Sequence, residues 1–101
     1  MRIILNIELP AEPFNAYVRK GTAGMILKEI LADIKPEAVY FTELDGRRGA
    51  ILIVNIKNSS EIPSVCEPFF LKFNAECRMR IMMSPDDLAK AGLEKLGKKW
   101  G

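Results

Sequence analysis

The sequence predicts an α+β fold of the ferredoxin-like type, with the element order β-α-β-β-α-β and an extra C-terminal helix. Two observations carry this prediction. Four short stretches have the alternation or the β-branched and aromatic content of strands, and apolar residues at helical spacing lie between them. The chain has 101 residues, which suffices for one modest core, so residues 1–101 are expected to form a single domain.

The first third of the chain predicts a strand followed by an interrupted helix. The segment RIILNIEL (2–9) alternates and is rich in Ile, which indicates a strand. A helical pattern follows from about 11 to 34, but its apolar face changes direction at RKGTAG, where Gly21 and Gly24 weaken a helix. We expect a bend or break there, with one continuous helix as the alternative.

A hairpin and a second helix are expected next. EAVYFTEL (37–44) and AILIVNI (50–56) have strand composition, and DGRRG between them predicts a turn. NSSEIP then favours the start of a helix, with Ser59 or Ser60 as its N-cap. The apolar spacing that continues this helix reaches about Phe73.

The last part of the chain predicts a fourth strand and a C-terminal helix. AECRMRIMM (75–83) alternates strictly, which is typical of a strand with one buried face. SPDD combines a capping serine, a proline in the first turn and two acidic residues, which favours a helix start. The helix is expected over about 85–99, with Gly92 as its weak point.

Pleat parity divides the strand residues between a face under the helices and a far face. The far face combines apolar residues at its centre with polar and charged ones: Ile4, Asn6, Tyr40, Thr42, Ile51, Ile53, Arg78 and Arg80. Covering a large apolar side chain is worth about 1.5–3 kcal/mol. We therefore expect these eight residues to form the interface of a two-fold homodimer, or else the C-terminal helix to fold across them.

Composition and charge exclude several kinds of partner. The net charge is +2, and the third strand has aliphatic residues where RNA-binding domains of this topology carry stacking aromatics, so we expect no nucleic-acid partner. No segment approaches the roughly 20 apolar residues of a membrane span. The N-terminus also lacks the flanks of a signal peptide, so no membrane partner and a cytoplasmic location are expected.

The chain contains no histidine and has two cysteines, Cys66 and Cys77, outside any metal-ligand spacing. We therefore expect no metal site and no cofactor, and we assign no catalytic residue. Without an export signal, the two cysteines are expected to be buried thiols rather than a disulfide. No neighbouring base is identifiable that would make Cys66 a nucleophile.

Pro68 lies inside the helical pattern of CEPFFLKFN and cannot donate a hydrogen bond to the carbonyl of Ser64. A kinked helix or two short turns is the expected result. The kink could simply wrap the aromatic residues over the sheet, or it could open a gap between sheet and helices. In the second case, a pocket for a small apolar or aromatic molecule would combine apolar walls with a few polar groups. Its candidate residues are Asn15, Tyr40, Glu67 and Phe70.

Three stretches, KPEAVYFTELDGRRGAILIVNI, SSEIPSVCEPFFLKFNAE and MSPDDLAKAG, resemble a family of small, uncharacterised bacterial proteins. That family is similar to the dimeric α+β barrel superfamily, which includes muconolactone isomerase-like and cofactor-free monooxygenase-like proteins. The resemblance covers most of residues 10–92 and is most specific from Ile62 to Ala75. It implies a ferredoxin-like fold with back-to-back sheets that form a barrel in a homodimer, and it implies no reaction.

Three functions are compatible with these observations. The first is a small dimeric binding or accessory module with an unidentified small-molecule ligand. The second is a cofactor-independent isomerase or monooxygenase-like enzyme, in which a tyrosine or carboxylate moves a proton on an aromatic or lactone-like compound. The third is a protein-interaction module without a ligand. A closed cavity containing Glu67 or Tyr40 would favour the first two, and a filled core with a large exposed apolar patch would favour the third.

Overall fold

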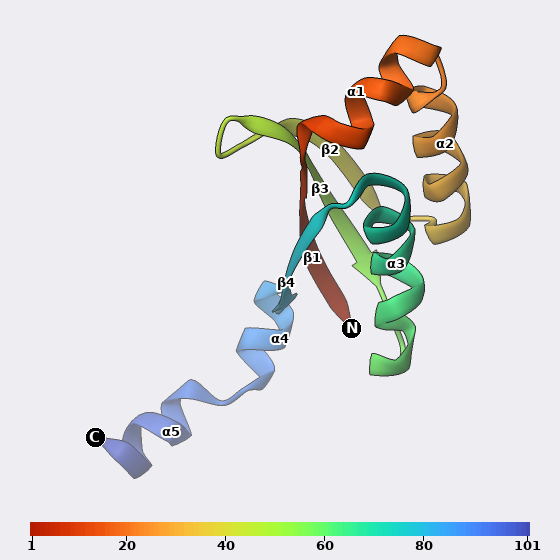
Figure 1. Ribbon diagram of the computed structural model, residues 1–101. Helices are drawn as coiled ribbons and strands as arrows, with labels where there is room; N and C mark the ends of the chain where they lie inside the picture. The colour runs from red at the N-terminus through yellow and green to blue at the C-terminus, as the bar shows by residue number, and fades with distance from the viewer.

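The computed structural model describes residues 1–101 and has the predicted order of strands and helices (Figure 1). The strands are β1 (Arg2–Leu9), β2 (Ala38–Leu44), β3 (Arg47–Asn55) and β4 (Glu76–Met82). The helices are α1 (Ala11–Lys20), α2 (Ala23–Ile34), the 3-10 turn η1 (Ser59–Glu61), α3 (Ile62–Phe73), α4 (Pro85–Lys90) and α5 (Leu93–Trp100). All strand pairs are antiparallel in the order β2-β3-β1-β4, which confirms the ferredoxin-like fold.

One face of the sheet is covered by helices α1, α2 and α3, and the other is not (Figure 1). The strand register places Val39, Leu52, Leu5 and Met79 in one row across the covered face, as pleat parity predicts. The largest fully buried side chains come from this face and from the helix above it: Phe69, Phe73, Leu5, Ile7, Leu9 and Leu52. The core therefore lies in a single layer between the sheet and the three helices.

The interruption expected at RKGTAG is confirmed. Gly21 adopts a left-handed conformation with φ 74°, and its N–H donates to the carbonyl of Val18 at 3.0 Å, which ends α1. Helix α2 starts at Ala23. This break lets α1 place Phe14 against Phe73 at a ring-centroid distance of 5.2 Å, while α2 turns back along the sheet (Figure 1).

The hairpin turn is shorter than the sequence suggested. Asp45 and Gly46 both have positive φ, 53° and 78°, which is the geometry of a two-residue turn that matches the twist of the flanking strands. Strand β3 consequently begins at Arg47 rather than at residue 50. The second arginine of the turn motif, Arg48, therefore lies within the strand, where its guanidinium covers the ring of Phe14 at 4.5 Å.

The start of the second helix also differs from the prediction. Neither Ser59 nor Ser60 is an N-cap: Asn58 caps the 3-10 turn η1 in a capping box with Glu61, and Glu61 is the N-cap of α3. The carboxylate of Glu61 accepts the backbone N–H groups of Lys57 at 2.6 Å and Asn58 at 2.7 Å. These two hydrogen bonds hold the pKa of Glu61 below its ordinary value, because they favour the ionised carboxylate.

The two short turns that the sequence allowed at Pro68 are not found. Helix α3 runs as one α-helix from Ile62 to Phe73 with Pro68 inside it, and it ends where Asn74 takes a positive φ of 53°. Phe69 and Phe73, which follow Pro68 and lie one helical turn apart, are fully buried. Packing of these aromatic side chains against the sheet therefore keeps the segment helical, although proline removes one backbone hydrogen bond.

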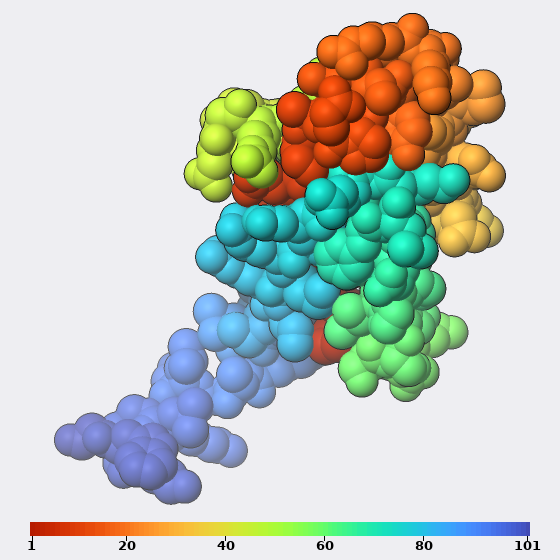
Figure 2. All heavy atoms as spheres, viewed as in Figure 1, coloured from red at the N-terminus to blue at the C-terminus, as the bar shows by residue number.

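The C-terminal helix predicted over 85–99 is two helices, because Gly92 adopts a left-handed conformation with φ 73° between α4 and α5. We call residues 84–101 the arm. The arm projects away from the sheet and does not fold across its uncovered face (Figures 1 and 2). The Cα radius of gyration is accordingly 17.2 Å, whereas a compact domain of this length has a radius of about 13 Å. None of the helices is long and apolar enough to cross a bilayer.

Candidate functional site

The uncovered side of the sheet, which we call the open face, has an apolar centre. Ile4 lies opposite Ile53, and Ile51 lies between Asn6 and Tyr40 in the next row of the sheet. The three isoleucines are only partly buried, and Tyr40 is 66% exposed. Aliphatic side chains at the centre of a sheet are usually covered by another layer, and the single chain supplies no such layer on this face.

Charged residues border this apolar centre on the β4 side. Glu8 is 9% exposed, and its carboxylate oxygens lie 3.5 Å from Arg47 Nη1 and 3.6 Å from Arg78 Nη1. Arg78 also reaches Glu76 at 3.4 Å. Arg78 thus takes part in a cross-strand ladder of ion pairs, whereas Arg80 makes no ion pair within the chain. Its guanidinium remains available to a carboxylate of a partner or to a small anion.

The structure brings the predicted interface residues together on one surface. They occupy adjacent rows of the open face: Ile4, Asn6, Tyr40, Thr42, Ile51, Ile53, Arg78 and Arg80. The pairing register that achieves this follows from the alternation in each strand, because a shift by one residue would turn every one of these side chains to the other face. The homodimer that they are expected to form stays a prediction.

The four residues of the predicted pocket do not converge. Tyr40 lies on the open face, whereas Asn15, Glu67 and Phe70 belong to helices on the opposite side of the sheet. Asn15 instead accepts a hydrogen bond from Arg48 Nη1 at 2.7 Å, at the surface. Glu67 and Phe70 are exposed on α3. The sheet itself separates Tyr40 from the other three, so one chain cannot place all four around one ligand.

The gap between the sheet and α3 is small. It has a volume of about 10 Å³, which is the lower limit for one water molecule. Eight apolar residues line it: Ile3, Leu5, Val54, Ile56, Ile62, Val65, Cys66 and Met79. A second hollow of about 170 Å³ lies where the ends of α2 and β3 meet α3, whereas a small-molecule site of the usual size needs about 300 Å³ or more. Neither space reaches that size, so the sheet and the helices enclose no ligand cavity, and Pro68 instead lines an open hollow between α2 and α3.

Both cysteines are free thiols, and Cys66 lines the gap between the sheet and α3. Burial raises the pKa of Cys66, whose thiol contacts Cys77, and burial raises the pKa of Cys77 to about 12. A thiolate is the reactive form of cysteine, and a raised pKa makes it scarce at neutral pH. This agrees with the expectation that Cys66 is a buried apolar residue and not a nucleophile.

Sequence reasoning missed the apolar surface of the arm. Leu88, Leu93, Leu96 and Trp100 are between 43% and 77% exposed, and none is buried in the chain. The signal was present in the sequence, because positions 93, 96 and 100 follow the i, i+3, i+7 spacing of one helix face.

Fold and surface together define a ferredoxin-like sandwich with one sheet face left free. Among solved structures the chain is similar to 5-chloro-2-hydroxyhydroquinone dehydrochlorinase (TftG) from Burkholderia phenoliruptrix AC1100, in complex with 2,5-dihydroxybenzoquinone. The two share 15% sequence identity at a TM-score of 0.58, over 85% of this chain and 97% of that one. At this identity the likeness establishes the fold and nothing further.

Two more structures are similar at lower TM-scores. The designed protein Ferredog-Diesel has 14% identity and a TM-score of 0.46 over 80% of this chain and 85% of its own. A structural-genomics protein from Agrobacterium tumefaciens has 13% identity and a TM-score of 0.40 over 84% and 98%. No protein-family model matches the chain, and the search of curated proteins finds no match.

Proposed function

We propose that this protein is a homodimeric interaction module, with the open face as the contact between its two copies. One observation carries the proposal: the core of the single chain is filled, whereas an apolar sheet face remains uncovered. A filled core leaves no room for a substrate between sheet and helices. An uncovered apolar face is the property expected of a surface that binds protein.

Energetics favour a second copy on this face. Each large apolar side chain that is fully removed from water contributes about 1.5–3 kcal/mol. Ile4, Ile51 and Ile53 are already partly buried, so each contributes less than this, but in a two-fold dimer every contact occurs twice. The isoleucines lie in the two middle strands β1 and β3, where a facing sheet would exclude water most completely.

The charges on the open face are compatible with partial burial. Glu8 already has two arginine partners, so a second copy would not leave its carboxylate unpaired. Arg80 has no carboxylate partner within the chain and would need one at a dimer contact. Glu76 is exposed near the same edge, and the same residue of a second copy is the acceptor that a two-fold arrangement would supply.

Sedimentation velocity of the variant Ile53→Glu tests the dimer. We expect the unmodified protein to sediment as a dimer at about 50 µM and Ile53→Glu as a monomer with an unchanged circular dichroism spectrum, because the carboxylate would be desolvated at the contact. Leu71→Glu is the matched control, since Leu71 is 79% exposed on the helix side. It should remain a dimer. A monomeric parent protein, or a dimer in Ile53→Glu, would contradict the proposal.

The structural likeness to the dehydrochlorinase favours a second candidate function. Its structure holds 2,5-dihydroxybenzoquinone, so a protein of this fold accommodates a small cyclic molecule. In this chain such a ligand would have to lie between two copies, near Tyr40, because the core has no cavity. Native mass spectrometry of protein purified without additives is the test. A dimer carrying extra mass that denaturation removes would favour this candidate, and a dimer without extra mass would favour the interaction module.

A further inference from the structure

The arm carries an apolar stripe that the rest of the chain does not use. Leu93, Leu96 and Trp100 lie on one side of α5, and Lys95 and Lys98 lie on the other. Leu88 of α4 lies with Leu93 beside an open hollow at the bend between the two helices. A helix with one apolar and one charged face normally packs its apolar face against another element.

The arm lacks the stability to persist as an isolated element. Helix α4 has 6 residues and α5 has 8. Isolated helices shorter than about 12–15 residues are marginal in water. Helix α4 ends at Ala91, α5 starts after Gly92, and Figure 2 shows the arm as a separate protrusion. A surface outside this chain is therefore needed to order it.

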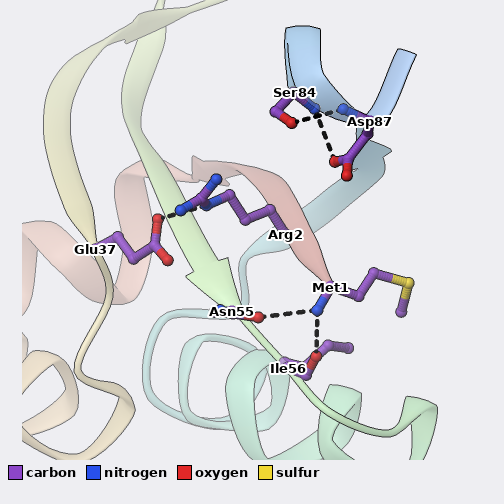
Figure 3. A network of polar contacts seen from close by, with 7 residues as sticks. All are labelled: Met1, Arg2, Glu37, Asn55, Ile56, Ser84 and Asp87. Atoms are coloured by element: carbon purple, nitrogen blue, oxygen red, sulfur yellow. Dashed lines mark hydrogen bonds and ion pairs between the residues drawn. The ribbon is translucent and has the colours of Figure 1, made fainter. Parts of the chain in front are cut away.

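The point at which the arm leaves the body indicates what that surface is. Ser84 and Asp87 cap the first turn of α4 with hydrogen bonds of 3.0 and 3.1 Å. Figure 3 shows this turn beside Arg2, whose positive charge also contributes to the lowered pKa of Asp87. Arg2 belongs to the edge row of the open face, paired with Asn55 and Met82. The arm thus starts at the rim of the open face.

From this rim the arm extends on the side of the sheet opposite to α2 and α3 (Figure 1). Any molecule docked on the open face would occupy the space beside it. A second copy of this chain is such a molecule, and the arm would then lie along it. The stripe of Leu88, Leu93, Leu96 and Trp100 would be covered without any movement of the body.

The size of the open face supports this assignment. A sheet of four strands of seven to nine residues has a face of roughly 20 by 25 Å, or roughly 500 Å² in outline. Stable protein interfaces bury about 800 Å² on each partner. The open face alone is small for a stable dimer, and the four large side chains of the arm supply the kind of surface that is missing.

We infer that the arm of each copy clasps the second copy in the homodimer, with the stripe Leu88, Leu93, Leu96 and Trp100 packed against the partner's body. The inference rests on the proposed function, because the second copy is the molecule that occupies the open face. It adds a second contact region to that dimer, contributed by a segment that has no packing role within its own chain. Two-fold symmetry doubles this contact, so the pair of arms closes around the pair of sheets.

Trp100 provides a direct readout, since it is the only tryptophan of the chain and is 77% exposed in the single copy. We expect its emission in the intact full-length dimer to be blue-shifted and protected from iodide. Dilution below the dissociation constant should shift the emission to the red. Sedimentation measured on the same samples separates the state of the dimer from the state of the arm.

Two matched double variants test the stripe. Leu93→Ala/Leu96→Ala removes apolar contacts, and Lys95→Ala/Lys98→Ala changes the opposite side of the same helix. Because each contact occurs twice in a dimer, the first variant should raise the dissociation constant by about 100-fold or more. The second should change it by less than about 3-fold, as expected for exposed charges.

The outcomes are distinguishable. A dimer with protected Trp100 and a selective effect of the leucine variant supports the clasp. A dimer with exposed Trp100, or with equal effects of the two variants, overturns the clasp and leaves the sheet-to-sheet dimer intact. A monomer with exposed Trp100 overturns both proposals. A monomer with protected Trp100 means that the arm folds onto its own open face, which also overturns both.

Discussion

The two faces of the sheet carry aliphatic residues of the same kind but differ in what covers them. Leu52 on β3 points to the helices and is fully buried, while its neighbour Ile51 points to the open face and is partly exposed. Helices α1 to α3 complete the first surface within the chain. The second surface remains incomplete until another molecule supplies a layer. A single alternating strand thus supplies both a buried core face and the uncovered face that we propose as the contact between two copies.

The largest loss in the free energy of unfolding is expected for a substitution on the covered face. Leu52→Ala should lower the free energy of unfolding by about 3 kcal/mol, because it removes buried methyl groups and leaves a cavity that the packed helices cannot fill. Urea unfolding followed by circular dichroism measures this, and the loss should be the same at every protein concentration. A loss below about 1 kcal/mol would mean that this face is not the tightly packed core.

A smaller loss of stability, which depends on protein concentration, is expected for a substitution of Ile51 on the open face. Ile51→Ala should cost about 1 kcal/mol or less at protein concentrations where the chain is monomeric, because Ile51 is only partly buried there. At about 100 µM the loss should grow to about 2 kcal/mol per copy, because the dimer stabilises the folded state by mass action. Equal losses at the two concentrations would remove the distinction between the two faces.

The smallest change in stability is expected for Glu61, whose carboxylate caps the turn before α3. The pKa of Glu61 is lower in the folded chain than its ordinary value of 4.5, because it accepts two backbone N–H groups. Ionised Glu61 therefore adds stability above pH 4.5, and this contribution disappears as the pH falls through the folded-state pKa.

Thermal unfolding of Glu61→Gln at two pH values checks this. The variant should melt below the parent protein at pH 7, and the difference should shrink as the pH is lowered through the folded-state pKa and the carboxylate of the parent becomes protonated. Glu67→Gln on the exposed side of α3 is the control, because Glu67 makes no hydrogen bond or ion pair. A pH-independent difference for Glu61→Gln would argue against the cap as its cause.

Strand alternation made the sheet predictable. Residues 2–9 and 75–83 alternate so regularly that the strands and their faces could be assigned without coordinates, and the register confirms the assignment of the faces. The turn was harder to place, because DGRRG contains both a two-residue turn and two arginines that equally suit a loop or a strand. Only the positive φ of Asp45 and Gly46 distinguishes the shorter turn.

The candidate pocket was not predictable in the same way. Proline disfavours the helix interior by intrinsic propensity, but in α3 the burial of Phe69 and Phe73 decides the backbone. The bend between α4 and α5 is likewise set by one conformational choice at Gly92, which a local pattern leaves open. Where a residue's conformation is set by long-range packing, the sequence around it indicates the alternatives but does not select among them.

The two edges of the sheet differ in how they would behave in a crowded solution. Strand β4 bears Arg78 and Arg80, and such charges discourage an additional strand from pairing. Strand β2 instead presents Tyr40 and Phe41, which are 66% and 57% exposed, on a free hydrogen-bonding edge. An uncharged aromatic edge of this kind can template the growth of aggregates. Any partner that shelters β2 would therefore protect the chain against self-association into insoluble material.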